Sequence, residues 1–230
     1  MLNLFHLQSV SKLRSTIHDW IAASMTIIWY REVLLQCPME STVLDVGVGT
    51  GTGLLTNRDI IRSKKLFVTG VDYDGDYVQS ANENVSKYGL NDQIKIVHSS
   101  ILDFKESPFD VIYFSGSFMI MPQKMDVLKH CCSLLRGSKS NGVSSVEEKE
   151  NVGILFFTQT FEKPTLLGLY VTPLLKHLLK IITTIDFGEV TYEKDFLVTL
   201  KEAEVRVVSL RTLEESYFRK QVIVIARPEN

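Results

Sequence analysis

The sequence predicts an α/β fold: a doubly wound, mostly parallel seven-stranded sheet with a C-terminal antiparallel strand pair, helices on both faces and an N-terminal helical extension. Three observations predict it. Strand-like and helical runs alternate between residues 41 and 161, as in a parallel sheet covered by helices. The strand-like runs are continuously apolar, which is typical of strands buried on both faces. The last two, at 204–210 and 220–227, lie too close in sequence for a parallel crossover, so we expect them to pair antiparallel.

The positions of the apolar runs locate the individual elements. Strands are expected at 41–48, 65–73, 93–100, 108–117 and 152–161. Helices are expected at 51–63, after a group of glycines, at 74–89, ending at a glycine, and at 123–137. In the last helix the apolar residues share one face: Val127, Leu128, Cys131, Leu134 and Leu135.

Three further segments complete a single domain that spans residues 1–230. Residues 1–40 are predicted to form N-terminal helices. Residues 137–151 are polar and lack apolar periodicity, so we expect a flexible surface insertion there. Residues 164–185 are predicted to form an apolar helical cover, which Pro173, Lys176 and Lys180 interrupt too often for a membrane span.

Composition and charge limit the possible functions. The chain has 230 residues, of which 45% are hydrophobic and 23% charged, with a net charge of −2. Nucleic-acid binding requires a clustered basic surface, and the sequence contains no such cluster, so no nucleic-acid partner is expected. Three cysteines without metal-ligand spacing predict no metal site and a reducing, cytoplasmic location. The N-terminal 18 residues contain Lys12 and Arg14 but no acid, which leaves an organellar location as the alternative.

The segment "VLDVGVGTGTGLL", residues 43–55, has four glycines at alternate positions after an apolar run. A strand that turns through glycines into a helix presents free backbone N–H groups and permits close approach of a ligand. The dinucleotide spacing G-x-G-x-x-G is excluded, because the third glycine position is occupied by Thr52 or Leu54. A phosphate-binding P-loop is excluded because no Gly-Lys-Ser/Thr follows.

The residues instead have the pattern D-x-G-x-G-x-G, formed by Asp45, Gly47, Gly49 and Gly51. This pattern resembles the first motif of the class I S-adenosylmethionine-dependent methyltransferases. The resemblance implies S-adenosyl-L-methionine as cofactor and S-adenosyl-L-homocysteine as product. It places the acid near the amino-acid end of the cofactor and the backbone around Val48 against it. A carboxylate suits this cofactor, which carries an ammonium and a sulfonium but no pyrophosphate.

Three later segments extend the resemblance. "VTGVDYDGDYV" resembles the second motif, which implies that Asp72 accepts the ribose hydroxyls and that Tyr73 contacts the adenine. In "IVHSSILDF", the third-motif region, many members of the family have an acid that bonds the adenine amine. Ser100 occupies that position, so the N–H of Ile101 or the side chain of Asp103 is the alternative.

The fourth segment concerns the reacting end of the cofactor. "FDVIYFSGSFMIM" resembles the family's fourth motif, which places Ser115, Gly116 and Ser117 beside the methyl group. The segment lacks the Asn/Asp-Pro-Pro-aromatic run of methylases that act on base amino groups. The acceptor is therefore expected to be a small molecule, apolar or aromatic. A protein methyltransferase and a catalytically silent binding module are the alternatives.

Spacing identifies no catalytic residue, and His98 and His130 are expected to be ordinary packed or exposed histidines. We predict that part of the apolar run at 165–183 covers a substrate pocket beside the fourth motif, together with three aromatic residues: Trp20, Trp29 and Tyr30. Core packing, a dimer surface and peripheral membrane contact are the alternatives for this run. The oligomeric state is left open.

Overall fold

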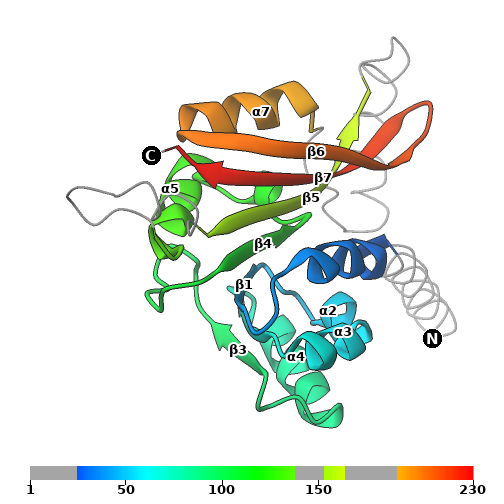
Figure 1. Cartoon of the computed structure of the whole chain (residues 1–230), viewed down its shortest axis with the longest axis vertical. Helices are drawn as coiled ribbons and strands as arrows, with labels where there is room; N and C mark the ends of the chain where they lie inside the picture. Colours follow the sequence, from blue (N-terminus) through cyan, green and yellow to red (C-terminus); the bar gives the residue numbers. More distant parts are fainter. Residues whose placement is uncertain (1–24, 138–152, 164–190, 230) are drawn as a thin grey trace, which may run out of the picture.

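The computed structural model describes residues 25–137, 153–163 and 191–229 (Figure 1). The predicted polar insertion, the apolar cover and Trp20 lie outside these residues. Of the N-terminal extension, residues 25–36 are described and are helical. No helix within the described ranges is long and apolar enough to cross a membrane.

The described residues contain one seven-stranded sheet in the order β3-β2-β1-β4-β5-β7-β6. β1 to β5 run parallel, and β7 lies antiparallel between β5 and β6. The strands are β1 (Thr42–Val46), β2 (Phe67–Asp72), β3 (Ile94–His98), β4 (Val111–Ser115), β5 (Ile154–Glu162), β6 (Val205–Glu215) and β7 (Arg219–Pro228). The predicted fold class, including the antiparallel pair, is confirmed.

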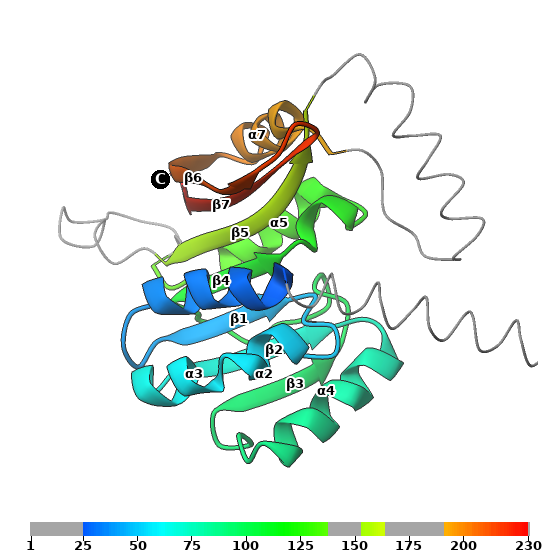
Figure 2. The ribbon, with the colours of Figure 1, turned by 90° about the vertical axis from the view of Figure 1, so that its right-hand side faces the viewer.

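Helices cover both faces of the sheet (Figure 2). The helical residues 25–36 and three helices lie on one face: α2 (Thr52–Thr56), α3 (Arg58–Lys64) and α4 (Gly75–Lys87). The other face is covered by a short 3-10 helix, η1 (Phe118–Ile120), and by α5 (Lys124–Leu134) and α7 (Glu193–Glu202). The central strands therefore separate two apolar cores, which explains why their sequences are continuously apolar.

The single helix predicted at 51–63 is wrong, because the chain forms two helices that meet at Asn57. The Asn57 amide donates to the carbonyl oxygens of Gly53 and Ile27, both at 2.9 Å. Asparagine competes for backbone carbonyls in this way, which favours a helix end over a helix interior. The break also links the loop region to the helical residues 25–36, in which Ile27 lies.

The C-terminal region differs from the prediction in two ways. β6 continues five residues past 210, to Glu215, so only residues 216–218 separate it from β7. Sequence reasoning also missed α7, although it has acids in its first turn and the apolar pair Phe196 and Leu200 at i, i+4 spacing. Phe196 packs against the rings of Phe118, Phe157 and Phe161.

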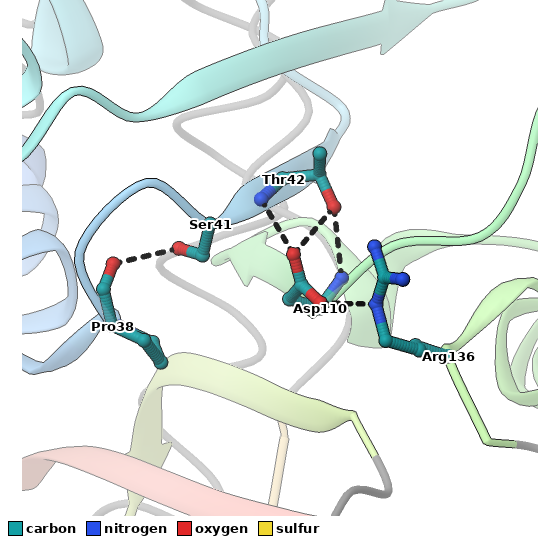
Figure 3. Close-up of polar contacts among 5 residues, drawn as sticks. All are labelled: Pro38, Ser41, Thr42, Asp110 and Arg136. Carbon is teal, nitrogen blue, oxygen red and sulfur yellow. Dashed lines mark hydrogen bonds and ion pairs between the residues drawn. The ribbon is translucent and has the colours of Figure 1, made fainter.

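A partly exposed polar contact joins the amino ends of β1 and β4, opposite the edge where their carboxyl ends lie (Figure 3). Asp110 Oδ2 accepts from the backbone N–H and the hydroxyl of Thr42, both at 2.8 Å, and Arg136 Nε donates to Asp110 Oδ1 at 2.5 Å. Burial alone raises the pKa of Asp110, but the Thr42 hydrogen bonds and the Arg136 cation outweigh it and lower the pKa.

Candidate cofactor site

The predicted site residues gather at the carboxyl ends of three neighbouring strands. Asp45 lies in β1, Asp72 ends β2 and Ser115 ends β4. The strand order reverses between β1 and β4, because the chain proceeds from β1 to β2 and β3 and then crosses to β4. In open α/β sheets, ligands bind outside the carboxyl ends at this switch point.

The glycine loop that follows β1 has a left-handed backbone at three positions. Gly47, Gly49 and Gly51 have φ of 78°, 56° and 69°, values that side chains with a Cβ rarely adopt. A Cβ on Gly47 would also lie 2.7 Å from Ser117 Cβ. A Cβ on Gly49 would have nothing within 4 Å, so the loop is open at that position. These glycines are required by backbone shape, and at Gly49 the bare backbone leaves room for another molecule.

Asp72 connects the glycine loop to α4. Its Oδ2 accepts from the Gly49 N–H at 2.8 Å, and its Oδ1 accepts from the Asp74 N–H at 3.0 Å. The side chain that caps α4 is Asp74, which accepts from the backbone N–H groups of Asp76 and Tyr77. Asp72 is therefore not the helix cap. Because a carboxylate has about four lone-pair sites, both oxygens of Asp72 keep acceptor capacity.

Asp45 is buried, with 1% of the residue exposed, and only one of its oxygens has a partner among the described residues. Its Oδ2 accepts from the hydroxyl of Tyr30 at 2.8 Å, whereas no donor within the described ranges reaches Oδ1. Burial raises the pKa of Asp45 to about 7; the Tyr30 hydrogen bond lowers it and the charge of Asp72 raises it. An unpaired carboxylate oxygen in a buried position suits a cationic group.

The other predicted cofactor contacts lie around this centre. Val48 and Ile101 are buried, Val48 against Gly70 and Ile101 in the core, so their side chains serve packing. Tyr73 is 80% exposed, and its carbonyl oxygen contacts His98 Nε2 at 3.0 Å. Ser100 is exposed, and its hydroxyl accepts from the Leu102 N–H at 3.3 Å.

The fourth-motif residues divide into two roles. The Ser115 hydroxyl is buried at the end of β4, beside the hydroxyls of Tyr30 and Tyr113. The Ser117 hydroxyl instead donates to the carbonyl of Val46 at 2.5 Å, and Ser117 packs on Gly47. Ser117 therefore holds the glycine loop against β4, and its position beside the methyl group stays a prediction.

Trp29 and Tyr30, the two described aromatic residues that were predicted to cover a pocket, lie in different surroundings. Trp29 lies over Gly116, 3.1 Å from the position a Cβ would take, and its Nε1 donates to Gln221 Oε1 at 2.9 Å. Tyr30 is not a cover, because it is buried between Asp45 and Gly53. Sequence reasoning missed both hydrogen bonds, since partners 192 and 15 positions apart leave no periodic signal.

Comparison with known proteins agrees with this geometry. Residues 43–138 match the model of a family described as a methyltransferase domain. Over these residues the chain is similar to methyltransferase domains. The matched residues begin in β1 and include the glycine loop, Asp72, Ser100 and Ser115.

Two curated relatives align with the methyltransferase domain over less than half of their length. A ribosomal protein L11 methyltransferase from Desulforamulus reducens is 33% identical over 93 residues, 39% of this chain and 29% of the relative. A tRNA1(Val) (adenine(37)-N6)-methyltransferase from Dyadobacter fermentans is 30% identical over 98 residues, 40% of each chain.

A solved structure extends the similarity of fold beyond the matched domain. The geranyl diphosphate C-methyltransferase from Streptomyces coelicolor A3(2), in complex with Mg²⁺, geranyl diphosphate and S-adenosyl-L-homocysteine, has a TM-score of 0.62 at 13% identity. The alignment covers 89% of this chain and 78% of that one. The similarity of fold therefore extends beyond residues 43–138, which the family model matches.

Proposed function

We propose that this methyltransferase domain binds S-adenosyl-L-methionine and transfers its methyl group to a small apolar or aromatic molecule. One observation carries the proposal: two buried carboxylates, Asp45 and Asp72, flank a loop of left-handed glycines at the switch point of the sheet. Asp72 already fixes this loop through the Gly49 N–H.

The residues fit the cofactor in chemistry as well as in position. The unpaired Oδ1 of Asp45 would pair with the cationic amino-acid end, and the remaining lone pairs of Asp72 would accept the ribose hydroxyls. Tyr73, Ser100 and the N–H of Ile101 would hold the adenine, and Ser115 would lie nearest the methyl group. When bound, the cofactor supplies an electrophilic methyl group on its sulfonium. The protein positions the acceptor, which contributes roughly 7–11 kcal/mol in well-oriented reactions.

A small acceptor is favoured by the surroundings of Ser115. Trp29 lies over the adjoining Gly116, so an indole ring bounds the end of β4 at this position. The structural neighbour from Streptomyces coelicolor has an isoprenoid diphosphate as its ligand. A protein acceptor is the second candidate, because the relative from Desulforamulus reducens is a ribosomal protein methyltransferase.

Titration calorimetry with S-adenosyl-L-methionine and S-adenosyl-L-homocysteine tests the cofactor site. Asp72→Ala should weaken binding roughly ten- to a hundredfold, because hydrogen bonds to a charged acceptor contribute about 1.5–3 kcal/mol. Asp92→Ala, an exposed acid, is the matched control and should bind like wild type. Absence of heat for the wild-type protein would exclude the cofactor, and equal affinities for both variants would exclude the ribose assignment.

The acceptor class requires a separate experiment. The protein is incubated with cell extract and cofactor carrying a labelled methyl group, and the products are separated into protein, nucleic-acid and small-molecule fractions. Label in the small-molecule fraction supports the proposal, and label in protein or nucleic acid replaces the proposed acceptor. Binding of cofactor without transfer to any fraction would favour a catalytically silent binding module.

A further inference from the structure

Tyr30 brings the N-terminal helical segment into direct contact with the cofactor site. The residue is 4% exposed, and its ring meets the ring of Tyr113 edge-on at a centroid distance of 5.0 Å. Burial, reinforced by the Asp45 and Tyr113 charges, raises the pKa of Tyr30 well above its usual value. The phenol therefore stays protonated and donates its hydrogen bond to Asp45 Oδ2.

The fourth glycine of the loop is required by this contact. Gly53 lies in α2 and does not have the left-handed backbone of the three glycines before it. A Cβ at Gly53 would lie 2.6 Å from Tyr30 Cδ2 and 2.8 Å from Cε2, which no real Cβ tolerates. Glycine is costly inside a helix, so its presence here has a packing reason. The loop and the Tyr30 ring are fitted to each other.

Resting on the proposed function, we propose that Tyr30 is a positioning residue for the cofactor: it fixes one oxygen of Asp45, so that the enclosed second oxygen, which has no partner among the described residues, is left to pair with the ammonium. A carboxyl group that is fixed by one hydrogen bond loses rotational freedom before the ligand arrives. The segment 25–36 thereby becomes part of the cofactor site, although none of its residues lies in a cofactor motif.

The charge state of Asp45 gives this role a measurable signature. The titratable groups that face Asp45 are Tyr30 from the N-terminal segment, Tyr113 from β4 and Asp72 from β2. An ammonium binds the ionised carboxylate, so affinity should fall by up to tenfold for each pH unit below the pKa of Asp45. Loss of the Tyr30 donor removes a group that stabilises the ionised form, so the pKa of Asp45 should rise.

Two ligands separate positioning of the ammonium from general damage to the site. S-Adenosyl-L-homocysteine has the amino-acid end without the sulfonium, and 5′-methylthioadenosine has neither the ammonium nor the carboxylate of that end. Titration calorimetry between pH 5.5 and 8 with both ligands should show a strong pH dependence for the first and none for the second.

Tyr30→Phe removes only the hydroxyl and is the primary variant. It should weaken binding of S-adenosyl-L-homocysteine about tenfold or more at pH 7, shift its pH dependence to higher pH and leave 5′-methylthioadenosine unchanged. Tyr88→Phe is the matched control, because its ring is 37% exposed at the C-terminal end of α4 and takes no part in the cluster around Asp45. In an Asp45→Asn background, Tyr30→Phe should have no further effect on the pH dependence.

A second variant keeps the test decisive if Tyr30→Phe folds poorly. Gly53→Ala displaces the Tyr30 ring and should cause the same selective loss. Equal weakening of both ligands by these variants, or wild-type affinity and pH dependence in Tyr30→Phe, would refute the positioning role while leaving the cofactor site intact. Failure of wild-type protein to bind either ligand would instead refute the proposed function on which this role rests.

Discussion

Asp45 should make the stability of the cofactor-free protein depend on pH in a way that asparagine cannot reproduce. Burial raises its pKa from 3.8 to about 7, and each pKa unit corresponds to about 1.4 kcal/mol. The raised pKa means that the folded state binds a proton that the unfolded state has already released between pH 4 and 7. The stabilising contribution of Asp45 to the folded state is therefore complete below pH 4 and is lost as pH rises to 7.

The perturbation that isolates this contribution is Asp45→Asn, which keeps the shape of the side chain but does not titrate. Between pH 5 and 8 the free energy of unfolding of the wild type should fall by about 2.7 kcal/mol relative to that of the variant, because the range from pH 5 to the pKa of about 7 spans two pKa units. The variant should thus gain stability relative to wild type as pH rises, levelling above pH 7. The side chain is fully buried, so solvent screening does not reduce this figure.

Urea denaturation at pH 5, 6, 7 and 8 measures the difference in the free energy of unfolding at each pH. Using the difference between the two proteins removes the titration of all other groups. Asp92→Asn, an exposed acid, serves as the control and should show no trend. A difference between Asp45→Asn and wild type that stays constant from pH 5 to 8 would refute the reasoning, because Asp45 would then be ionised throughout.

Two remaining predictions concern regions away from the cofactor. Asp110→Ala should lower the free energy of unfolding by about 1–3 kcal/mol at pH 7, because it leaves the Thr42 N–H without an acceptor. The pKa of Asp110 is lowered, so this loss of stability should shrink as pH falls from 5 to 3. A loss that does not depend on pH would contradict the prediction. A variant that breaks the exposed Lys95–Glu106 ion pair is the control. Deletion of residues 138–150 with a short linker should leave cofactor affinity unchanged in calorimetry, since Gly153 N–H donates to the Arg136 carbonyl at 2.9 Å and holds the flanks together. A large loss of affinity would mean that this segment contributes to the site.

The architecture and the position of the candidate site could be predicted from the sequence because both depend on local patterns. Continuous apolar runs identify strands buried on both faces, and the ends of parallel strands necessarily share one edge. Asp45 and Asp72 could therefore be placed together, although Asp72 lies on a different strand. The grouping of Gly47, Gly49 and Gly51 indicated a turn between strand and helix, and the backbone there is left-handed at all three positions.

Tertiary structure decided which of these residues touch, and why each one is needed. In the sequence, Gly53 is the fourth of four alternating glycines. In the structure, a glycine is required there because the Tyr30 ring, from a separate helix, leaves no room for a Cβ. Ser117 looks like a substrate contact, yet its hydroxyl bonds the carbonyl of Val46, 71 residues earlier. Such contacts depend on how helices dock on the sheet, and docking depends on the packing of whole faces. The sequence by itself determined the strands and helices and the edge of the sheet at which the site lies, because these follow from the periodicity of apolar residues. The contact partners of Asp45, Gly53 and Ser117 depend instead on how segments far apart in the chain pack together, which only the tertiary structure shows.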